Sequence, residues 1–528
     1  MVLSQRGVVA SEHPLASQAG AQVLAEGGNA VDAALAANAV MGVVAPMTCG
    51  VGGDLFALVY EARTGRLHGL NASGWAPSQL SLEALREQGF TNMPQRGIHS
   101  VTVPGAVAGW EALSTRFGRQ RWSKWLAPAI RLADEGFPVT EIVAGYWASS
   151  ERLMSGDPVA ARTFLPGGRA PKVGEIFRNP ELAWTLRQLA RGGRKTFYEG
   201  VLARRLLAAW RDHGGALTAS DLRDFRPEWV EPISTDYRGW TVYEIPPQGQ
   251  GIAVLMMLNL MEPFPLGDWG RASTSTWHTM IEAKKLAYAD MLRYVADLRF
   301  GPVPTAGLLS KTYARERARL IDPDRAQADV PAGQPPAHGG DTTYLCAVDR
   351  EGNLVSLIQS NYGGFGSGLA VAGFGLQNRG GLFTLDPSHP NVLAPRKRPL
   401  HTIIPGFMTK GEVRIAFGIM GGWNQAQAHA QFVANLVDHA MNLQAALEAP
   451  RFTKLTFDGL DVQTESRVPM DVRAGLAAKG HDVRVAGAFA DSVGGGQAVM
   501  RDFASGVNSG ASDPRKDGAA VPEPVGGK

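Results

Sequence analysis

A Pro- and Gly-rich segment, residues 321–341, divides the chain into two halves of different character. The half before it is mainly helical in pattern, with amphipathic stretches at 125–135, 183–191 and 279–295. The half after it returns to short apolar runs that are typical of strands. A helical half followed by a strand-rich half predicts an α+β protein in which sheets pack face to face beneath helices.

Turn and cap signals place individual elements. Two Ala-rich helices are expected within 14–45, separated by Gly27-Gly28, with Asn29 as the N-cap of the second. Also expected in this half are a buried strand at 55–60, a strand region at 232–245 and an apolar helix opened by the loop 246–251. In the second half we expect strands at 342–349, 353–361, 413–419, 482–486 and 494–501, helices at about 425–440 and 443–448, and a disordered tail after Pro514.

Composition favours a globular protein with a sizeable core. Of the 528 residues, 45% are hydrophobic and 19% are charged. A chain of this length suits two to four domains or one large sandwich with insertions. The net charge of +3 gives no reason to expect a nucleic-acid partner. Cys49 and Cys346 cannot form a disulfide framework or a metal site by themselves. No signal peptide or bilayer-length apolar run is evident, so we expect a soluble, cytoplasmic protein with no membrane partner.

Thr342 and Thr343 open the first strand-like run after the linker. A hydroxyl in the middle of a chain needs an external base, whereas the hydroxyl of a first residue has its own α-amino group as the base. Cleavage between Asp341 and Thr342 would therefore turn a strand start into a catalyst. The alternative is an ordinary loop that enters a hairpin, because Thr is common in strands.

Short motifs in a fixed order extend over nearly the whole chain. They are residues 27–34, 50–54, 103–110, 246–251, 282–284, 288–290, 342–343, 352–353, 365–368, 397–400, 421–422, 449–452 and 510–515. In this order they resemble the γ-glutamyltransferase family of N-terminal nucleophile hydrolases. Any one motif is weak evidence, and the resemblance rests on the collinear order of the whole set.

The resemblance implies a four-layer αββα sandwich that cuts itself before Thr342. The products would be a mainly helical large subunit, residues 1–341, and a strand-rich catalytic small subunit, residues 342–528, which stay associated. It implies a small-molecule amide substrate, an acyl-enzyme on Thr342, and neither a metal nor an organic cofactor.

The resemblance also implies roles around the nucleophile. The backbone N–H groups of Gly421 and Gly422 match the family's oxyanion hole, although a plain turn after the strand 413–419 would also use glycine. Thr343 and Ser360 match hydroxyls that orient the nucleophile, with Ser360 in place of the usual Thr.

The substrate pocket departs from the family pattern at the positions that clamp a γ-glutamyl group. Leu82 falls at the position of an Arg that binds the substrate α-carboxylate, and Leu382 at that of an Asp that binds its α-amine. Tyr362 replaces an Asn, and His401-Thr402 replace a Ser-Ser pair. Arg379 adds a positive charge nearby. Arg86 and Arg96 are candidates to replace the lost Arg.

Three hypotheses follow. The first is a γ-glutamyl amide hydrolase or transferase that acts on substrates such as glutathione. The second is an acylase or amidase for another acid, glutaryl- or oxamate-like, whose carboxylate is held by Arg379 and His401. For these two residues the alternative is that Arg379 points to solvent and His401 is a hydrogen-bonded core residue. The third hypothesis is an uncleaved, non-catalytic binding protein.

Overall fold

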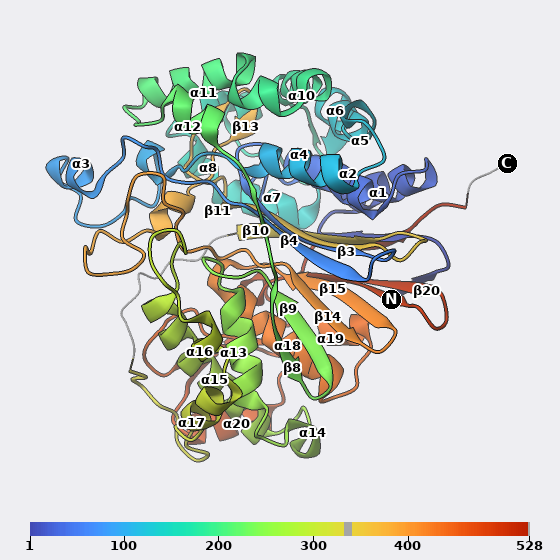
Figure 1. Ribbon diagram of the computed structural model, residues 1–528, viewed down its shortest axis with the longest axis vertical. Coiled ribbons are helices and arrows are strands. Elements are labelled where there is room, and N and C mark those ends of the chain that lie inside the picture. Colours follow the sequence, from blue (N-terminus) through green and yellow to red (C-terminus); the bar gives the residue numbers. More distant parts are fainter. Residues whose placement is uncertain (332–340, 526–528) are drawn as a thin grey trace.

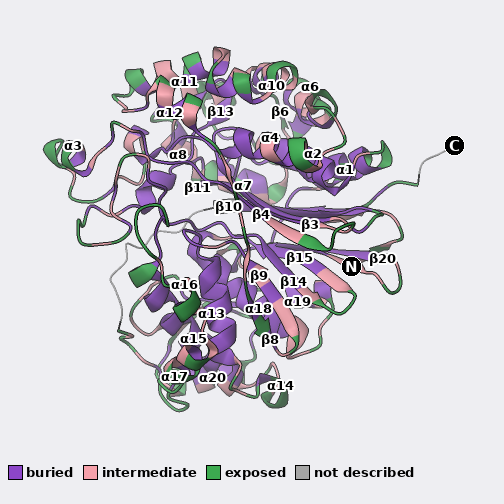
Figure 2. Ribbon diagram, in the orientation of Figure 1, coloured by how far each residue is buried: buried purple, intermediate pink, exposed green. Residues whose placement is uncertain are grey.

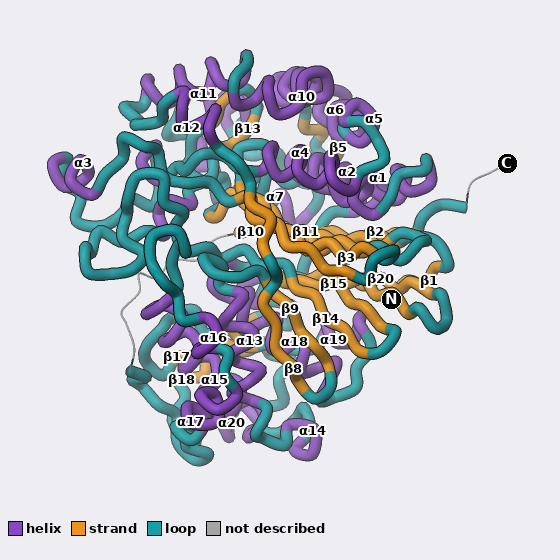
Figure 3. Tube along the Cα trace, in the orientation of Figure 1, coloured by secondary structure: helices purple, strands orange, loops and turns teal. Residues whose placement is uncertain are grey.

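The computed structural model describes residues 1–331 and 341–525, with the backbone alone for Asp341 and Thr342. Two seven-stranded sheets lie face to face, and helices cover the outer face of each (Figure 1). The tube in Figure 3 shows the strands as a central double layer between two helical layers. The α+β class and the four-layer αββα sandwich predicted from the sequence are confirmed.

The two sheets are antiparallel throughout. The β10 sheet has the order β21 (Ala519–Pro522), β2 (Val8–Ser11), β10 (Asp341–Val348), β11 (Leu354–Tyr362), β3 (Asp54–Glu61), β4 (Arg66–Ala72) and β7 (Glu228–Val230). The β15 sheet has the order β1 (Val2–Ser4), β20 (Val507–Ser512), β19 (Gly496–Asp502), β15 (Val413–Ile419), β14 (Gly406–Lys410), β9 (Trp240–Glu244) and β8 (Ile233–Tyr237).

Both faces of the central strands are buried, because each sheet packs against the other sheet on one side and against helices on the other (Figure 2). Side chains alternate accordingly along β10. Tyr344, Cys346 and Val348 belong to the core between the sheets, while Leu345 and Ala347 belong to the core beneath the helices. Strands buried on both faces read as continuous apolar runs, which is why these segments were recognisable in the sequence.

The helical layers follow from local cap signals. Over the β10 sheet lie α1 (Pro14–Ala25) and α2 (Ala30–Val44), and Asn29 caps α2 through a capping box, as predicted. Over the β15 sheet lie α13 (Gly251–Met261) and α18 (Gln425–Val437), with α15 (Thr274–Tyr294) packed against α13. Within the described part of the chain, none of the helices combines the length and apolar character needed to cross a bilayer. The cytoplasmic location stays a prediction.

Further helices and small sheets complete the fold. The remaining α-helices are α3 (Leu82–Glu87), α4 (Ala106–Phe117), α5 (Trp122–Trp125), α6 (Ala127–Glu135), α7 (Glu141–Ser149), α8 (Glu151–Met154), α9 (Pro158–Phe164), α10 (Pro180–Tyr198), α11 (Val201–Asp212), α12 (Ala219–Asp224), α14 (Leu266–Trp269), α16 (Thr305–Leu308), α17 (Lys311–Ala318), α19 (Leu443–Glu448) and α20 (Met470–Ala478). The small sheets contain β5 (Phe137–Pro138) with β6 (Ile176–Phe177), β12 (Ala370–Val371) with β13 (Phe374–Gly375), and β16 (Phe452–Thr453) with β17 (Asp461–Glu465) and β18 (Asp482–Ala486).

The predicted separation into a helical half and a strand-rich half is wrong in one respect. Strands β1 to β4 and β7 to β9 come from before residue 321 and contribute to both large sheets. The first part of the expected linker is also held in place, since Ala326 N–H donates a hydrogen bond to Lys479 O at 2.7 Å. The rest of that linker, residues 332–340, lies outside the described residues.

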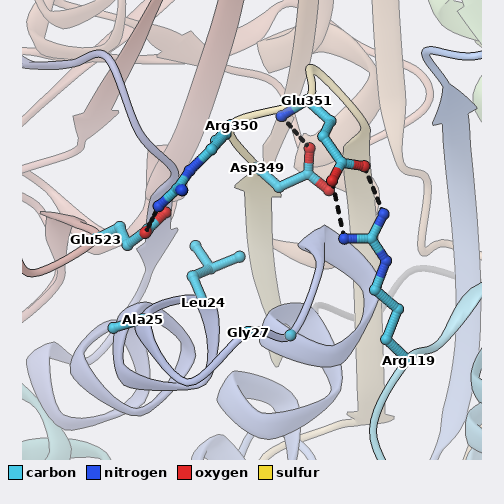
Figure 4. Close-up of a pocket in the computed structure, with 9 residues that line it drawn as sticks. Leu24, Ala25, Gly27, Arg119, Asp349, Arg350, Glu351 and Glu523 are labelled. Carbon is cyan, nitrogen blue, oxygen red and sulfur yellow. Dashed lines mark hydrogen bonds and ion pairs between the residues drawn. The ribbon is translucent and has the colours of Figure 1, made fainter. Parts of the chain in front are cut away.

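The disordered tail predicted after Pro514 is wrong. Residues 519–522 form β21, which pairs with β2 along the edge of the β10 sheet. Glu523 then exchanges hydrogen bonds with Gly7 and forms an ion pair with Arg350 at 2.5 Å (Figure 4). The Glu523–Arg350 pair ties the end of the chain to the turn between β10 and β11, and in the same region Arg119 pairs with Glu351 of that turn. The small apolar residues of β21 gave little strand signal, and an edge strand tolerates its proline.

Candidate active site

Thr342 lies where the ladder between β10 and β11 is irregular. Asp341 is opposite Tyr362 and Thr343 is opposite Gln359, so the register shifts between these two pairs. Such bulges bend a strand and are common beside active sites. The position is at the end of the strand pair, where the chain enters the sheet.

The two hydroxyl residues expected to orient the nucleophile lie on opposite faces of the sheet. Ser360 shares the alternation of Ile358, which lies in the core between the sheets, and its Oγ accepts a hydrogen bond from Tyr362 N–H at 2.8 Å. Thr343 shares the alternation of Leu345 and faces the helices. Its buried Oγ1 has no hydrogen-bond partner among the described residues. Only Ser360 therefore faces the interior between the sheets.

Gly421 and Gly422 form the turn that follows β15. Their φ angles are +123° and +58°, values that favour glycine. Neither backbone N–H group donates a hydrogen bond within the described part of the chain. Gln250, from the loop that opens α13, donates through Nε2 to Gly422 O at 2.8 Å and fixes the carbonyl side of the turn. The turn thus leaves two N–H donors available for an anionic oxygen.

Arg379 and His401 both contact Asp54, and Thr402 contacts Arg379. Asp54 belongs to the sequence motif 50–54, but no role was predicted for it. Arg379 Nε lies 3.5 Å and His401 Nε2 3.1 Å from Asp54 Oδ2. Arg379 Nη1 also donates to Thr402 Oγ1 at 2.7 Å. All four side chains are fully buried. Arg379 therefore does not point to solvent, and the signal for Asp54 was its place at the start of a buried strand, opposite Ser360.

Electrostatics set the charge state of this cluster. Burial lowers the pKa of His401 to about 4, and the Arg379 charge adds to that effect. His401 Nδ1 accepts Ile403 N–H at 3.3 Å, so Nε2 carries the proton that is donated to Asp54. Burial also lowers the pKa of Arg379 to about 10, which leaves the guanidinium charged at neutral pH.

One nitrogen of the Arg379 guanidinium, Nη2, is buried without a hydrogen-bond partner among the described residues. The guanidinium carbon lies 4.6 Å from the centre of the Tyr362 ring. Tyr362 itself has φ +74°, an uncommon conformation for a residue with a side chain, directly opposite the start of β10. Burial raises the pKa of Tyr362 to about 12, so its phenol is neutral.

A cavity of about 340 Å³ lies beside the glycine turn. Its walls include Leu382 and Trp423, and Trp423 directly follows Gly422. The residues that line it are Asn92, Leu292, Val295, Leu382, Thr384, Asp386, His389, Asn391, Leu400 and Trp423. Leu82 is absent from this lining. It packs in a separate apolar cluster with Phe383 and Leu385.

The two candidate replacements for the lost Arg are both engaged elsewhere. Arg86 donates to Leu385 O at 2.9 Å, in the loop that follows Leu382. Arg96 donates to Gly364 O at 2.9 Å and lies against Gly363, next to Tyr362. Arg96 is therefore close to the site, whereas Arg86 supports its outer loop.

Among the described residues, one group of side chains has metal-ligand character, and it lies away from the site. His278 and Glu282 on α15 and His481 after α20 place ligand atoms within 4.8 Å of one another. His278 Nδ1 shares a hydrogen bond of 2.8 Å with His481 Nε2, and Lys285 Nζ donates to Glu282 at 2.7 Å. Because the lysine already neutralises the carboxylate, this group does not suit a divalent cation.

Comparison with known proteins places these features in a family. The family model described as "Gamma-glutamyltranspeptidase" matches residues 16–523. The chain is 37% identical over 529 residues to the "Glutathione hydrolase-like YwrD proenzyme" of Bacillus subtilis, covering 98% of this chain and 99% of the relative. It is 34% identical to the "Acylase ACY 1 proenzyme" of Pseudomonas sp. strain SE83, over 98% and 93% of the two chains. The crystal structure of cephalosporin acylase from Bacillus halodurans superposes with a TM-score of 0.93 at 44% identity, over 99% and 96% of the chains.

Proposed function

Because the chain belongs to the gamma-glutamyltranspeptidase family of enzymes, we propose that it is an amidohydrolase whose nucleophile is the hydroxyl of Thr342, freed by cleavage of the Asp341–Thr342 bond. One observation carries the proposal. The irregular start of β10 meets the inward-facing Ser360 on the neighbouring strand β11.

The reaction follows from an N-terminal hydroxyl. The α-amine of Thr342 takes the proton of its own hydroxyl, whose oxygen attacks the substrate amide carbon. The N–H groups of Gly421 and Gly422 would bind the oxyanion, and each such donor is worth roughly 3 kcal/mol of barrier. The amine leaves with a proton, and water then attacks the ester on Thr342 and releases the acid. An acceptor amine in place of water would give transfer.

The fold explains how two subunits, 1–341 and 342–528, would stay together after cleavage. The β10–β11 hairpin lies between β2 and β3, which come from the other side of the cleavage point. In the second sheet β14 pairs with β9 in the same way. Each sheet is thus shared, and separation would break backbone hydrogen bonds in both.

The first candidate for the acyl group is γ-glutamyl, because a similar protein is named as glutathione hydrolase-like. The second candidate is an acid without an α-amino group, and Leu382 favours it. A leucine in the cavity beside the glycine turn offers no charge to an ammonium group. The free Nη2 of Arg379 could bind a carboxylate on such an acid.

The test compares the wild-type protein with Thr342→Ala and Thr342→Ser, using a γ-glutamyl anilide and a glutaryl anilide, which differ by the α-amino group. We expect anilide release by the wild type, none by Thr342→Ala, and reduced release by Thr342→Ser, which retains a hydroxyl. An uncut Thr342→Ala protein with wild-type activity would disprove the nucleophile. The ratio of the two anilides then decides between the acyl groups.

A further inference from the structure

The ladder between β14 and β15 ends at Phe417, four residues before Gly421 of the glycine turn. Its last pair joins Gly406 and Phe417, and the same register, continued by two residues, would place Ile404 opposite Ile419. That pair does not form, because β14 begins only at Gly406. Two backbone N–H groups at this end of the ladder therefore need other partners.

Two side chains of α18 supply those partners. Ile419 N–H donates to His429 Nε2 at 3.0 Å, and Ile404 N–H donates to Gln425 Oε1 at 3.2 Å. Gln425 and His429 are four residues apart and so lie on one face of the helix. Because α18 begins at Gln425, three residues after Gly422, the His429 bond to Ile419 ties the helix back to the strand that precedes the glycine turn.

His429 is itself held by Glu244, the last residue of β9. Its Nδ1 lies 2.9 Å from Glu244 Oε1, and both side chains are fully buried. Because Ile419 N–H can only donate, Nε2 carries no proton and Nδ1 donates to Glu244. Burial lowers the pKa of His429 to about 3, which leaves its imidazole neutral at pH 7, and burial raises the pKa of Glu244.

The rest of the turn is fixed as well. Met420 N–H donates to Gly495 O at 3.1 Å on the β19 side, and Gln250 holds Gly422 O. These contacts hold the residues on both sides of the glycine turn in place. The N–H groups of Gly421 and Gly422 have no partner among the described residues.

We propose that His429 and Gln425, with Glu244 behind His429, are positioning residues that hold the glycine turn in the orientation that binds the oxyanion of the reacting amide. This inference rests on the proposed function. Oxyanion donors act only when they are placed in advance at the position of the developing charge. A shift of about 1 Å can cost about 100-fold in rate.

The experiment uses His429→Leu and His429→Gln in the full chain, with turnover normalised to the amount of processed protein. Leucine removes the acceptor for Ile419 N–H, whereas the glutamine Oε1 can take the place of Nε2. We expect kcat to fall about 10- to 100-fold in His429→Leu with KM little changed. We expect His429→Gln to recover most of that loss. Equal kcat values in His429→Leu and the wild type would overturn the proposal.

A matched control lies on the same helix. Gln431 accepts Phe452 N–H at 3.1 Å and donates to Phe452 O at 3.1 Å, so it caps a strand in the same way, away from the turn. Gln431→Leu should lower the unfolding midpoint and leave kcat unchanged. If it lowers kcat as much as His429→Leu does, the effect is general destabilisation and the proposal is wrong.

Two further variants keep the test decisive. Should His429→Leu not fold, Gln425→Leu removes the other cap and must lower kcat in the same way. Glu244→Leu removes the acceptor of His429 Nδ1–H and should lower kcat in the same direction as His429→Leu, and a wild-type kcat in Glu244→Leu would contradict the role of Glu244. If the wild type shows no amidase activity, the proposed function is wrong. If the wild type is active and His429→Leu has the same kcat, only the positioning role is wrong.

Discussion

Arg379 and His401 approach the same oxygen of the Asp54 carboxylate, at 3.5 Å and 3.1 Å. The carboxylate neutralises the guanidinium and orients the neutral imidazole, so a buried positive charge is kept beside the strand end that carries Thr342. A charge buried in this way depends on its partner, because desolvation opposes the charged form of each group.

We therefore expect Asp54→Asn to destabilise the protein strongly. It would leave Arg379 charged and buried without a counterion, at a cost of about 3–5 kcal/mol. Asp134→Asn is the control, since it breaks an exposed ion pair with Arg187 and should cost less than about 1 kcal/mol. Denaturant unfolding measures both, and similar losses in the two variants would contradict the buried pairing.

The neutral state of His401 predicts a pH dependence of stability. Its pKa is about 4 in the folded protein, against an ordinary value of about 6.5. Between these values the unfolded chain binds a proton that the folded protein excludes, so stability is complete above pH 6.5 and falls as pH falls toward 4. His401→Asn removes this contribution. The stability advantage of the wild type should shrink by about 2 kcal/mol between pH 6.5 and 5, and a constant difference would refute it.

The position of Leu382 predicts a specificity change. Leu382→Asp places a carboxylate in the cavity beside the glycine turn, where it can bind an ammonium group. We expect it to raise γ-glutamyl turnover relative to glutaryl turnover by about 10-fold or more. Leu82→Asp is the matched control. It lies outside the cavity and should reduce stability without changing the ratio. An unchanged ratio in Leu382→Asp would show that the cavity does not bind the acyl group.

The C-terminal strand predicts a length requirement. A chain that ends at Asp517 loses β21 and the contacts of Glu523 with Gly7 and Arg350. We expect a loss of at least about 2 kcal/mol, because a buried charge-assisted hydrogen bond alone contributes on that scale. A chain that ends at Pro524 retains these groups and serves as the control. Equal thermal midpoints for the two chains would contradict a structural role for this segment.

Sequence reasoning succeeded where patterns are local. The strand 413–419, the helix 443–448 and the N-cap at Asn29 were predicted with the bounds that the structure has. Long apolar runs such as that of β3 are strong signals because both faces of the strand are buried. Strands β20 and β21 were missed, since Gly, Ser and Ala carry little strand preference and only pairing with distant strands orders them.

The site shows the same limit. Ser360 and the glycine turn could be named from motifs, but the face to which each side chain points depends on register. Thr343 and Ser360 were therefore both predicted to orient the nucleophile, although their side chains lie on opposite faces of the sheet. Asp54 contacts His401, which is more than 300 residues away in the sequence. Glu244 contacts His429, which is more than 180 residues away. No local spacing encodes such contacts.

The most direct test of the account is the intact mass of the purified protein. Two species are expected, residues 1–341 and 342–528, whose masses sum to that of the precursor plus one water molecule, together with a single uncut species for Thr342→Ala. A wild-type protein that releases anilide while uncut, or that is cut at another bond, would contradict Thr342 as the N-terminal nucleophile.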